Sequence, residues 1–247
     1  MKIAVWNIGH FSGGNAENTT IKEEELAQMT EKYRAYIYDE VGADVIGLCE
    51  NSPMLCNAQK GPVFAKNVIF DKYPICYEEI QLNYSANALY AKTGVTAARR
   101  HRFICNDTQT VTHTNLIKAS DYYYIKGELT LDGVPVTLIV CHLAFDCNKD
   151  PDTVNINQIK ELVRVTKDDP RVIIVGDFNC RDFAQFDLLK NAGYTLANDG
   201  SLATFPTGKN NRALDNIAVK GVLAKDVRMY PTELSDHYAL SAEISLA

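Results

Sequence analysis

No stretch of this 247-residue sequence stays apolar for long enough to cross a membrane. A transmembrane helix needs about 18 to 20 consecutive apolar residues, and the apolar runs here are much shorter. The first run, residues 3–6, follows Met1 and one lysine, and no long apolar core with a small-residue cleavage site comes after it. We therefore expect a soluble, cytoplasmic protein without a membrane span. Secretion after removal of a presequence stays an alternative.

The sequence also lacks the cysteine pattern of a disulfide framework or a zinc site. It has 7 cysteines, an odd number, and none of them forms a CxxC pair. Cys49 and Cys141 lie in or at the ends of apolar, strand-like runs. We expect buried free thiols in a reducing compartment.

An excess of positive charge is missing as well. Lys and Arg total 25 against 31 Asp and Glu, which gives a net charge of −6. Basic residues are dispersed apart from Arg99, Arg100 and Arg102 around His101. A protein that holds long nucleic acid by neutralising its phosphates alone carries a basic stripe. We interpret residues 99–102 as a solvated strand edge or turn rather than as a phosphate clamp.

Short apolar runs rich in β-branched residues recur along the chain, bounded by Gly, Asn and Asp. This pattern predicts strands at residues 2–7, 44–49, 86–91, 122–131, 134–141, 171–176, 214–219 and 238–245. An Asp132-Gly133 turn joins two of them, which predicts an antiparallel hairpin. The sheet structure is therefore mixed or partly antiparallel.

Three segments carry helical patterns, at residues 20–41, 154–167 and 183–191. Thr19-Thr20 is placed to cap the first helix, and residues 51–66 predict a surface loop. The length allows one large domain or two small ones. Because strands alternate with helices and no linker separates them, we expect a single α/β domain over residues 1–247.

Polar side chains follow or precede several of the predicted strands. A single Asp or Asn at such a place is usually a turn residue, so the recurrence is the informative feature. Strand ends at one edge of an α/β sheet converge in space, and oxygen ligands from several strands suit a hard cation such as Mg²⁺. The residues in this position are Asn7, Glu50, Asp177, Asn179, Asp236 and His237.

The most specific of these signals is the run at residues 172–179. An apolar strand ends at Gly176, which lets the chain approach its neighbours closely, and Asp177 and Asn179 follow two positions apart. Side chains two apart in an extended strand point to the same face. We expect the carboxylate and the amide to act at one site.

Together with further motifs, this run resembles the endonuclease/exonuclease/phosphatase superfamily. That superfamily includes DNase I-like nucleases, apurinic endonucleases, neutral sphingomyelinases and inositol-phosphate phosphatases. Six or seven ordered motifs over nearly the whole chain are far more specific than any one of them. They are Val5-Trp6-Asn7-Ile8, residues 44–50, Asn87-Ala88-Leu89, Cys141-His142-Leu143, Gly176-Asp177-Phe178-Asn179, Leu214-Asp215-Asn216-Ile217 and Ser235-Asp236-His237.

The resemblance implies a four-layer α/β sandwich, with two mixed, mostly antiparallel sheets flanked by helices. It also implies a Mg²⁺ site, with Mn²⁺ as an alternative ion, held by Asn7, Glu50 and Asp236. In such a site Asp177 would activate the attacking water, and Asn179 would orient that water or the phosphate.

Further roles follow from the same resemblance. Asp215 would hold His237, which would stabilise the negative charge that builds on phosphorus. His142 would bind the phosphoryl group or assist the leaving oxygen, and Asn87 would contact substrate together with Asn179 and His142. On local sequence alone, His142 fits a core histidine equally well, because its run is otherwise apolar.

The chain departs from the family pattern at a few positions. Cys49 stands where Gln is common, and Asn155 stands where Arg is common. Both positions usually support the site from outside it. His142 replaces the Tyr of apurinic endonucleases, which argues against that branch. His10 and the helix 20–41 fit a substrate wall or a purely structural role.

We therefore expect a Mg²⁺-dependent phosphoesterase that acts on a phosphomonoester or phosphodiester of small or modest size. Nucleic acid is the alternative substrate, and small phosphorylated molecules and lipid headgroups are favoured by the acidic charge balance. A catalytically silent binding module would be favoured by loss of catalytic groups, and none is lost. The sequence indicates no obligate protein partner.

Overall fold

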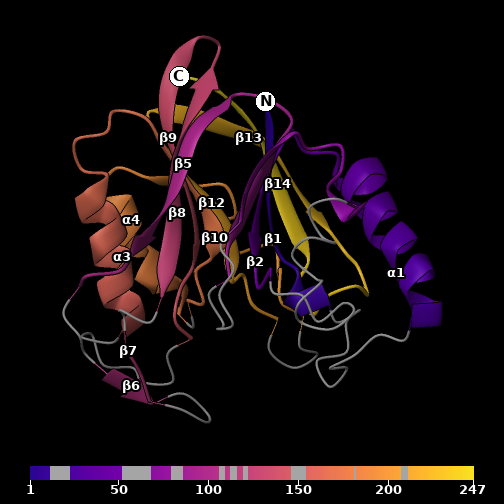
Figure 1. Ribbon diagram of the computed structural model, residues 1–247. Coiled ribbons are helices and arrows are strands. Elements are labelled where there is room, and N and C mark those ends of the chain that lie inside the picture. Colours follow the sequence, from indigo (N-terminus) through magenta and orange to yellow (C-terminus); the bar gives the residue numbers. More distant parts are fainter. Residues whose placement is uncertain are drawn as a thin grey trace.

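The computed structural model describes residues 1–11, 23–51, 68–78, 86–105, 109–111, 116–118, 122–145, 154–180, 182–206 and 211–247. In this part of the chain, two six-stranded sheets lie face to face and helices cover their outer sides (Figure 1). The four-layer α/β sandwich implied by the family resemblance is confirmed.

The first sheet contains the strand that opens the chain. Its order is β13 (Val222–Tyr230), β14 (Ala239–Leu246), β1 (Lys2–Asn7), β2 (Val45–Cys49), β4 (Ala88–Ala91) and β3 (Ile75–Glu78). Only β1 and β2 are parallel among these neighbours, and the other pairs are antiparallel. This sheet is therefore mixed, as predicted.

The second sheet contains the run that was most specific in the sequence. Its order is β11 (Thr195–Leu196), β12 (Asp215–Lys220), β10 (Val172–Asp177), β9 (Val134–His142), β8 (Tyr123–Leu131) and β5 (Val95–Arg102). Strands β9 and β10 are parallel, and β8 and β9 form the predicted antiparallel hairpin. A small separate sheet pairs β6 (Gln109–Val111) with β7 (Leu116–Lys118).

The inner faces of the two sheets pack together as an apolar core. Val5 and Val45 from the first sheet and Val140 and Val175 from the second are all fully buried in it. At Gly47 a Cβ atom would lie 2.6 Å from Val175 Cγ2, so this glycine lets the sheets approach. The close packing fixes the ends of β1, β2, β9 and β10 relative to one another.

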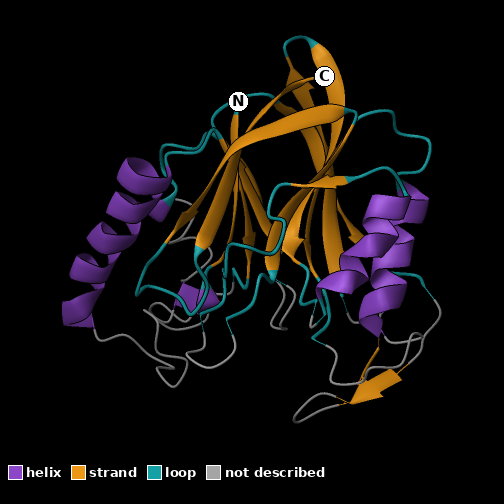
Figure 2. Cartoon of the chain, turned by 180° about the vertical axis from the view of Figure 1, so that it is seen from behind, coloured by secondary structure: helices purple, strands orange, loops and turns teal. Residues whose placement is uncertain are grey.

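Helices cover the two outer faces, as Figure 2 shows from behind. Helix α1 (Glu23–Ala35) and the π-helical turn η2 (Tyr36–Val41) pack on the first sheet, where Tyr36 contacts Trp6 at a ring distance of 4.7 Å. Helix α3 (Val154–Val165), the 3-10 turn η5 (Phe183–Phe186) and α4 (Asp187–Asn191) pack on the second sheet. A further 3-10 turn, η1 (Gly9–Phe11), follows β1.

All eight predicted strands are present, with ends that differ by no more than about two residues. The three predicted helices are also present. The predicted cap at Thr19-Thr20 and most of the predicted loop, at residues 52–66, lie outside the described residues. Six strands of the described residues were not predicted: β3, β5, β11 and β13, which are the edge strands of the two large sheets, and β6 and β7, which form the small sheet. In the described ranges no helix has both the length and the apolar character that a membrane crossing requires.

Candidate active site

Three neighbouring strands place three of the predicted site residues side by side. In the strand register, Asp177 on β10 lies beside His142 on β9 and opposite Asp215 on β12. Asn7 ends β1 of the facing sheet and pairs with Cys49, the residue before Glu50. The ends of both sheets therefore meet at one edge of the sandwich.

Asp177 is the centre of this cluster and is almost completely buried. Its Oδ2 atom accepts a hydrogen bond of 3.0 Å from Asn7 Nδ2. The Nε2 atoms of His142 and His237 lie 3.6 Å and 3.8 Å from the same oxygen. One carboxylate thus faces an amide and two imidazoles.

Asp177 and Asn179 lie at the same site, as predicted, but the backbone between them is not extended. The backbone N–H of Asn179 donates to Asp177 Oδ1 at 2.9 Å, and Asn179 has a left-handed φ of 49°. The chain turns directly after β10, so the prediction that the two side chains share one face of a strand was wrong in its geometry. The turn brings the amide to His142 instead, with Asn179 Nδ2 at 3.1 Å from His142 Nε2 and 2.9 Å from the Leu143 carbonyl oxygen.

Gly176 allows the close approach that its place in the sequence predicted. A Cβ atom on this residue would lie 1.9 Å from the carbonyl oxygen of Cys141 on the parallel strand β9. No side chain fits there without separating the two strands. Because His142 follows Cys141 and Asp177 follows Gly176, this contact sets the spacing between the histidine and the carboxylate.

Asp215 and His237 form a buried pair. Asp215 Oδ2 and His237 Nδ1 are 2.8 Å apart, so Nδ1 carries the proton and Nε2 faces Asp177. The His237 backbone is fixed on both sides, since its N–H donates to Ser235 Oγ and its carbonyl oxygen accepts from Trp6 Nε1. The ring also contacts Phe205 at 4.7 Å.

The charges around His237 favour its protonated form. Burial opposes that form, but the negative charges of Asp215 and Asp177 outweigh it and raise the pKa of His237 to about 10. Burial raises the pKa of Asp215 as well, and the charged imidazole opposes that change. An imidazolium held by a carboxylate is thus present at neutral pH, with Nε2–H as a donor aimed into the cluster.

Glu50 lies on the open side of the cluster, where its side chain is 23% exposed. Its Oε1 accepts a hydrogen bond of 3.3 Å from Asn7 Nδ2, and its Oε2 lies 3.0 Å from His10 Nε2. Burial would raise the pKa of Glu50, but the hydrogen bond from His10 and the nearby imidazoles lower it to about 2. The carboxylate is therefore ionised and available to a cation.

Backbone strain is concentrated around these residues. Glu50, Asn179, His10 and Phe11 all have φ values between 49° and 57°, a region that residues with a Cβ rarely adopt. Such strain persists where the surrounding structure holds it in place, and it clusters at functional sites. His10 is thereby directed at Glu50, a contact that the sequence pattern did not reveal.

His142 belongs to this cluster and is buried there. The sequence left open whether it was a core histidine, and its contacts with Asp177 and Asn179 place it among the predicted site residues. Because Asn179 Nδ2 donates to Nε2, the ring proton is on Nδ1. In the described part of the chain that Nδ1 atom has no hydrogen-bond partner.

Two predicted site residues stand apart from the hydrogen-bonded cluster. Asn87 is buried before β4 and donates to the carbonyl oxygen of Tyr123 at 2.9 Å, which links the two sheets. Asp236 is exposed, and Ser235 Oγ lies 3.4 Å from its Oδ1 atom. Their substrate and metal roles stay predictions.

Two residues next to the cluster, Cys49 and Asn155, were noticed in the sequence only because they differ from the family pattern. The Cys49 thiol donates to the Cys141 carbonyl oxygen at 3.3 Å, and the backbone N–H of Asp177 donates to its sulfur at 3.4 Å. Burial raises the pKa of this thiol well above its usual value. Cys49 therefore acts as a neutral spacer between the sheets, beneath Asp177.

Asn155 on α3 ties together the loops that follow β9 and β10. Its Nδ2 donates to the carbonyl oxygens of Ala144 and Phe178, at 3.0 Å and 2.7 Å, and its Oδ1 accepts from Gln185. Gln158, one turn later, accepts from the Ala144 backbone N–H. Through these contacts, the side chains of α3 hold the two loops in place.

Among the described residues, two sets of side chains could hold a cation: Asp177, Asp215 and His237, and Glu50 with Asn7. Ligand atoms of Asp177, Asp215 and His237 lie within 4.8 Å of one another. A metal ligand must be a neutral imidazole, whereas His237 is held in its protonated form by Asp215. The ionised and partly exposed carboxylate of Glu50 fits a hard cation better. Asn7 faces it with Nδ2, because its Oδ1 accepts from Gly9 N–H at 3.1 Å.

The comparisons with known proteins agree with this fold. Residues 4–237 match the model of the endonuclease/exonuclease/phosphatase family, and the chain belongs to this family. No curated protein sequence gives a significant match.

Solved structures add several relatives of the same fold. One is D. rerio TDP2 complexed with single strand DNA product, at 18% identity and a TM-score of 0.67, covering 99% of this chain and 98% of that chain. A second is sphingomyelinase C from Streptomyces griseocarneus, at 15% identity and a TM-score of 0.62, covering 98% of this chain and 98% of that chain. A third is the human Nocturnin catalytic domain with bound sulfate anion, at 14% identity and a TM-score of 0.64, covering 100% of this chain and 94% of that chain. At these identities the likeness shows the fold.

Proposed function

We propose that this protein is a Mg²⁺-dependent phosphoesterase that hydrolyses a phosphomonoester or phosphodiester of small or modest size. The observation that carries the proposal is the placement of Asp177 between two imidazoles, one of which is protonated and held by Asp215. A base for water and a cationic donor, a few ångströms apart in a buried cluster, are what phosphoryl transfer requires.

Asp177 takes the proton of the attacking water on its Oδ2 atom, the oxygen that faces Asn7 and both imidazoles. His237 donates from Nε2–H to the phosphoryl oxygens as their negative charge increases, and Asp215 keeps that ring protonated and oriented. Asn179 and His142 would contact the phosphoryl group on the other side of Asp177, with Asn87 contributing to substrate binding. This contact would require the Asn179 amide to turn away from His142 Nε2 and the Leu143 carbonyl oxygen, to which it now donates.

Glu50 would hold the cation, with Asn7 and Asp236 completing the set, and Mn²⁺ would serve as an alternative to Mg²⁺. Such a cation neutralises phosphate charge and lowers the pKa of bound water. Glu50 is suited to this because its carboxylate is ionised and reaches the open side of the cluster. An oxygen from Asn7 would require its amide to turn away from Gly9.

A small substrate is supported by the net charge of −6, which repels extended polyanions. Nuclease activity is the second candidate, supported by the TDP2 relative that was solved with a single-strand DNA product. A silent binding module is disfavoured because the proposed catalytic groups are all retained. Free thiols at Cys49, Cys141 and Cys180 support a reducing, cytoplasmic location.

An activity screen tests the proposed function directly. Purified protein with Mg²⁺ or Mn²⁺ is offered aryl phosphate mono- and diesters, inositol phosphates, sphingomyelin, plasmid DNA and abasic duplex. We expect metal-dependent release of phosphate or alcohol from a small ester. Cleavage of DNA alone would replace the small-substrate proposal with the nuclease, and no turnover of any phosphoester would overturn both.

Mg²⁺ or Mn²⁺ should also raise the thermal stability of the protein. A cation that binds only the folded state stabilises it by about 2.7 kcal/mol at a hundred times its Kd. Glu50→Gln should abolish the gain, because it removes the ionised carboxylate, whereas Glu40→Gln at an exposed position should keep it. Thermal melts with and without the ion measure this, and an equal shift in wild type and Glu50→Gln would place the cation elsewhere.

A further inference from the structure

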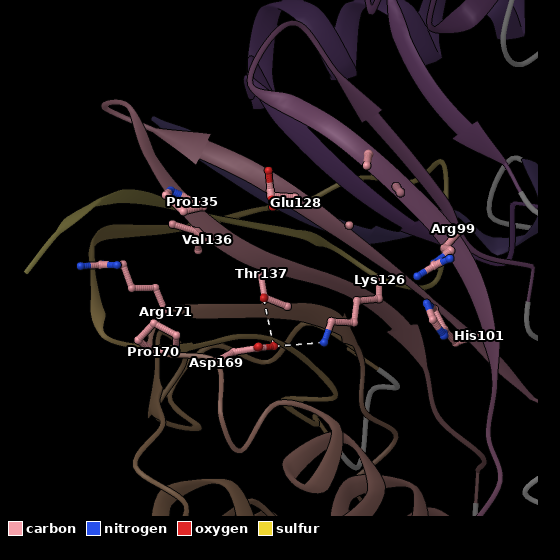
Figure 3. Close-up of a pocket in the computed structure, with 13 residues that line it drawn as sticks. Arg99, His101, Lys126, Glu128, Pro135, Val136, Thr137, Asp169, Pro170 and Arg171 are labelled. Carbon is pink, nitrogen blue, oxygen red and sulfur yellow. Dashed lines mark hydrogen bonds and ion pairs between the residues drawn. The ribbon is translucent and has the colours of Figure 1, made fainter.

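The outer face of the second sheet has a hollow of about 600 Å³ that the proposed catalysis does not use (Figure 3). It lies between β5, β8, the start of β9 and residues 169–171, just before β10. Thr137 lines it, whereas His142 ends the same strand five residues later. At ~3.3 Å per residue, the hollow and the candidate active site are separated by roughly 16 Å along β9.

One side of the hollow carries unbalanced positive charge. Arg99 on β5 lies directly opposite Lys126 on β8, and both line the hollow. Like charges at such cross-strand positions repel each other. Lys126 is compensated by Asp169 at 3.0 Å and by the Val165 carbonyl oxygen at 3.2 Å. The Arg99 side chain has no hydrogen bond or ion pair with any other residue that the structure describes.

His101 adds an imidazole to the same side. It follows Arg99 by two positions on β5, and its ring stacks on Tyr124 with 5.3 Å between centroids and 13° between planes. Burial, together with the positive charges of Arg99 and Lys126, lowers the pKa of His101. This ring lies in a positive field that an anion would offset. The sequence indicated a solvated strand edge or turn here; these residues belong to the edge strand β5, and one face of β5 lines the hollow.

The rest of the lining differs in character. Ala97, Val136 and Pro170 provide an apolar wall. In Figure 3, Arg99 and His101 lie together at one end of the hollow, while Pro170 and Arg171 lie at the other. The acidic residue Glu128 is hydrogen-bonded to the Thr96 hydroxyl at 3.2 Å. The lining thus carries two carboxylates: Asp169, which Lys126 engages, and Glu128, which accepts from Thr96. The Arg99 end adds the cations Arg99 and Lys126.

We propose that this hollow binds a small organic anion, with its phosphate or carboxylate group against Arg99, His101 and Lys126. The body of the ligand lies along the apolar wall formed by Ala97, Val136 and Pro170. The volume falls in the range of about 300 to 1,000 Å³ that small-molecule sites have. The anionic group supplies the partner that Arg99 lacks and reduces the cross-strand repulsion with Lys126.

The test follows the histidine ring signals by NMR in metal-free protein, with His101→Asn to assign the His101 signal. Phenylphosphonate and benzoate serve as probes, because neither is a phosphoester that the enzyme could hydrolyse. At least one should shift the His101 signal to saturation and raise its pKa, and the tighter of the two identifies the anionic group. Arg99→Gln should weaken that binding by roughly tenfold, the usual scale for a charge-assisted hydrogen bond.

Arg228→Gln is the matched control, because it removes an exposed arginine from β13 of the other sheet and should leave binding unchanged. Lys126→Gln should also weaken binding. Arg99→Gln is the decisive variant, because Lys126 contacts the end of α3 and its substitution would also remove that contact. Unchanged affinity in Arg99→Gln would overturn the proposal. So would shifts confined to His142 and His237, since the anion would then occupy the candidate active site. If inorganic phosphate binds as tightly as phenylphosphonate, the apolar wall does not contribute to binding, and that part of the proposal is wrong.

Discussion

Asp177→Asn is expected to lower turnover by roughly 10² to 10⁴, the usual scale for removing a positioned base. The substitution keeps the size of the side chain and an oxygen that can accept from Asn179 N–H, so the fold should be retained. It removes the negative charge that faces Asn7, His142 and His237. Steady-state kcat on the best ester from the activity screen measures the loss.

The control for this experiment is Asp132→Asn, in the hairpin turn between β8 and β9. Asp132 has a φ of 50°, a conformation that asparagine also tolerates, and it lies at the opposite end of β9 from His142. Its turnover and thermal midpoint should match those of wild type. If Asp177→Asn stays within a few-fold of wild-type kcat while folding normally, Asp177 is not the base and the proposed mechanism is wrong.

The central strands were predictable because they are buried on both faces. β10 and β12 are buried at nearly every position, so they appear in the sequence as uninterrupted apolar runs. The edge strands β5 and β13 alternate between exposed and partly buried positions and carry many charges. Such strands avoid apolar runs because an exposed apolar edge promotes aggregation. The sequence signal was therefore weakest where the sheets end.

The candidate site was likewise predictable only in part. Asn7, Glu50 and Asp177 were predictable because each directly ends or follows a buried strand, and strand ends converge. The contact of His10 with Glu50 depends on left-handed backbone at both residues, which no local pattern encodes. Ser235, which accepts from His237 N–H and donates to the Asn7 carbonyl oxygen, joins residues more than 200 positions apart. Pairings of this kind appear only once the fold is known.

The double substitution Asp215→Asn/His237→Ala is expected to be little worse than His237→Ala alone. His237→Ala should lower turnover by roughly 10² to 10⁴, because it removes the cationic donor to the phosphoryl oxygens. Asp215→Asn should act in the same direction, since Asp215 provides the largest of the charges that raise the pKa of His237 to about 10. Residues that act as a unit show strongly non-additive effects, so no second loss should follow once the imidazole is gone.

Kinetics of the two single variants and the double variant measure this coupling, with circular dichroism and thermal melts to confirm that each protein folds. The pH profile provides an independent readout: activity that depends on charged His237 should fall as the pH rises through about 10 in wild type, and at lower pH in Asp215→Asn. A variant that is merely misfolded would lose activity at every pH. If the two losses instead multiply in the double variant, Asp215 and His237 act independently. The 2.8 Å contact between them would then have no part in catalysis, even if the protein proves to be a phosphoesterase.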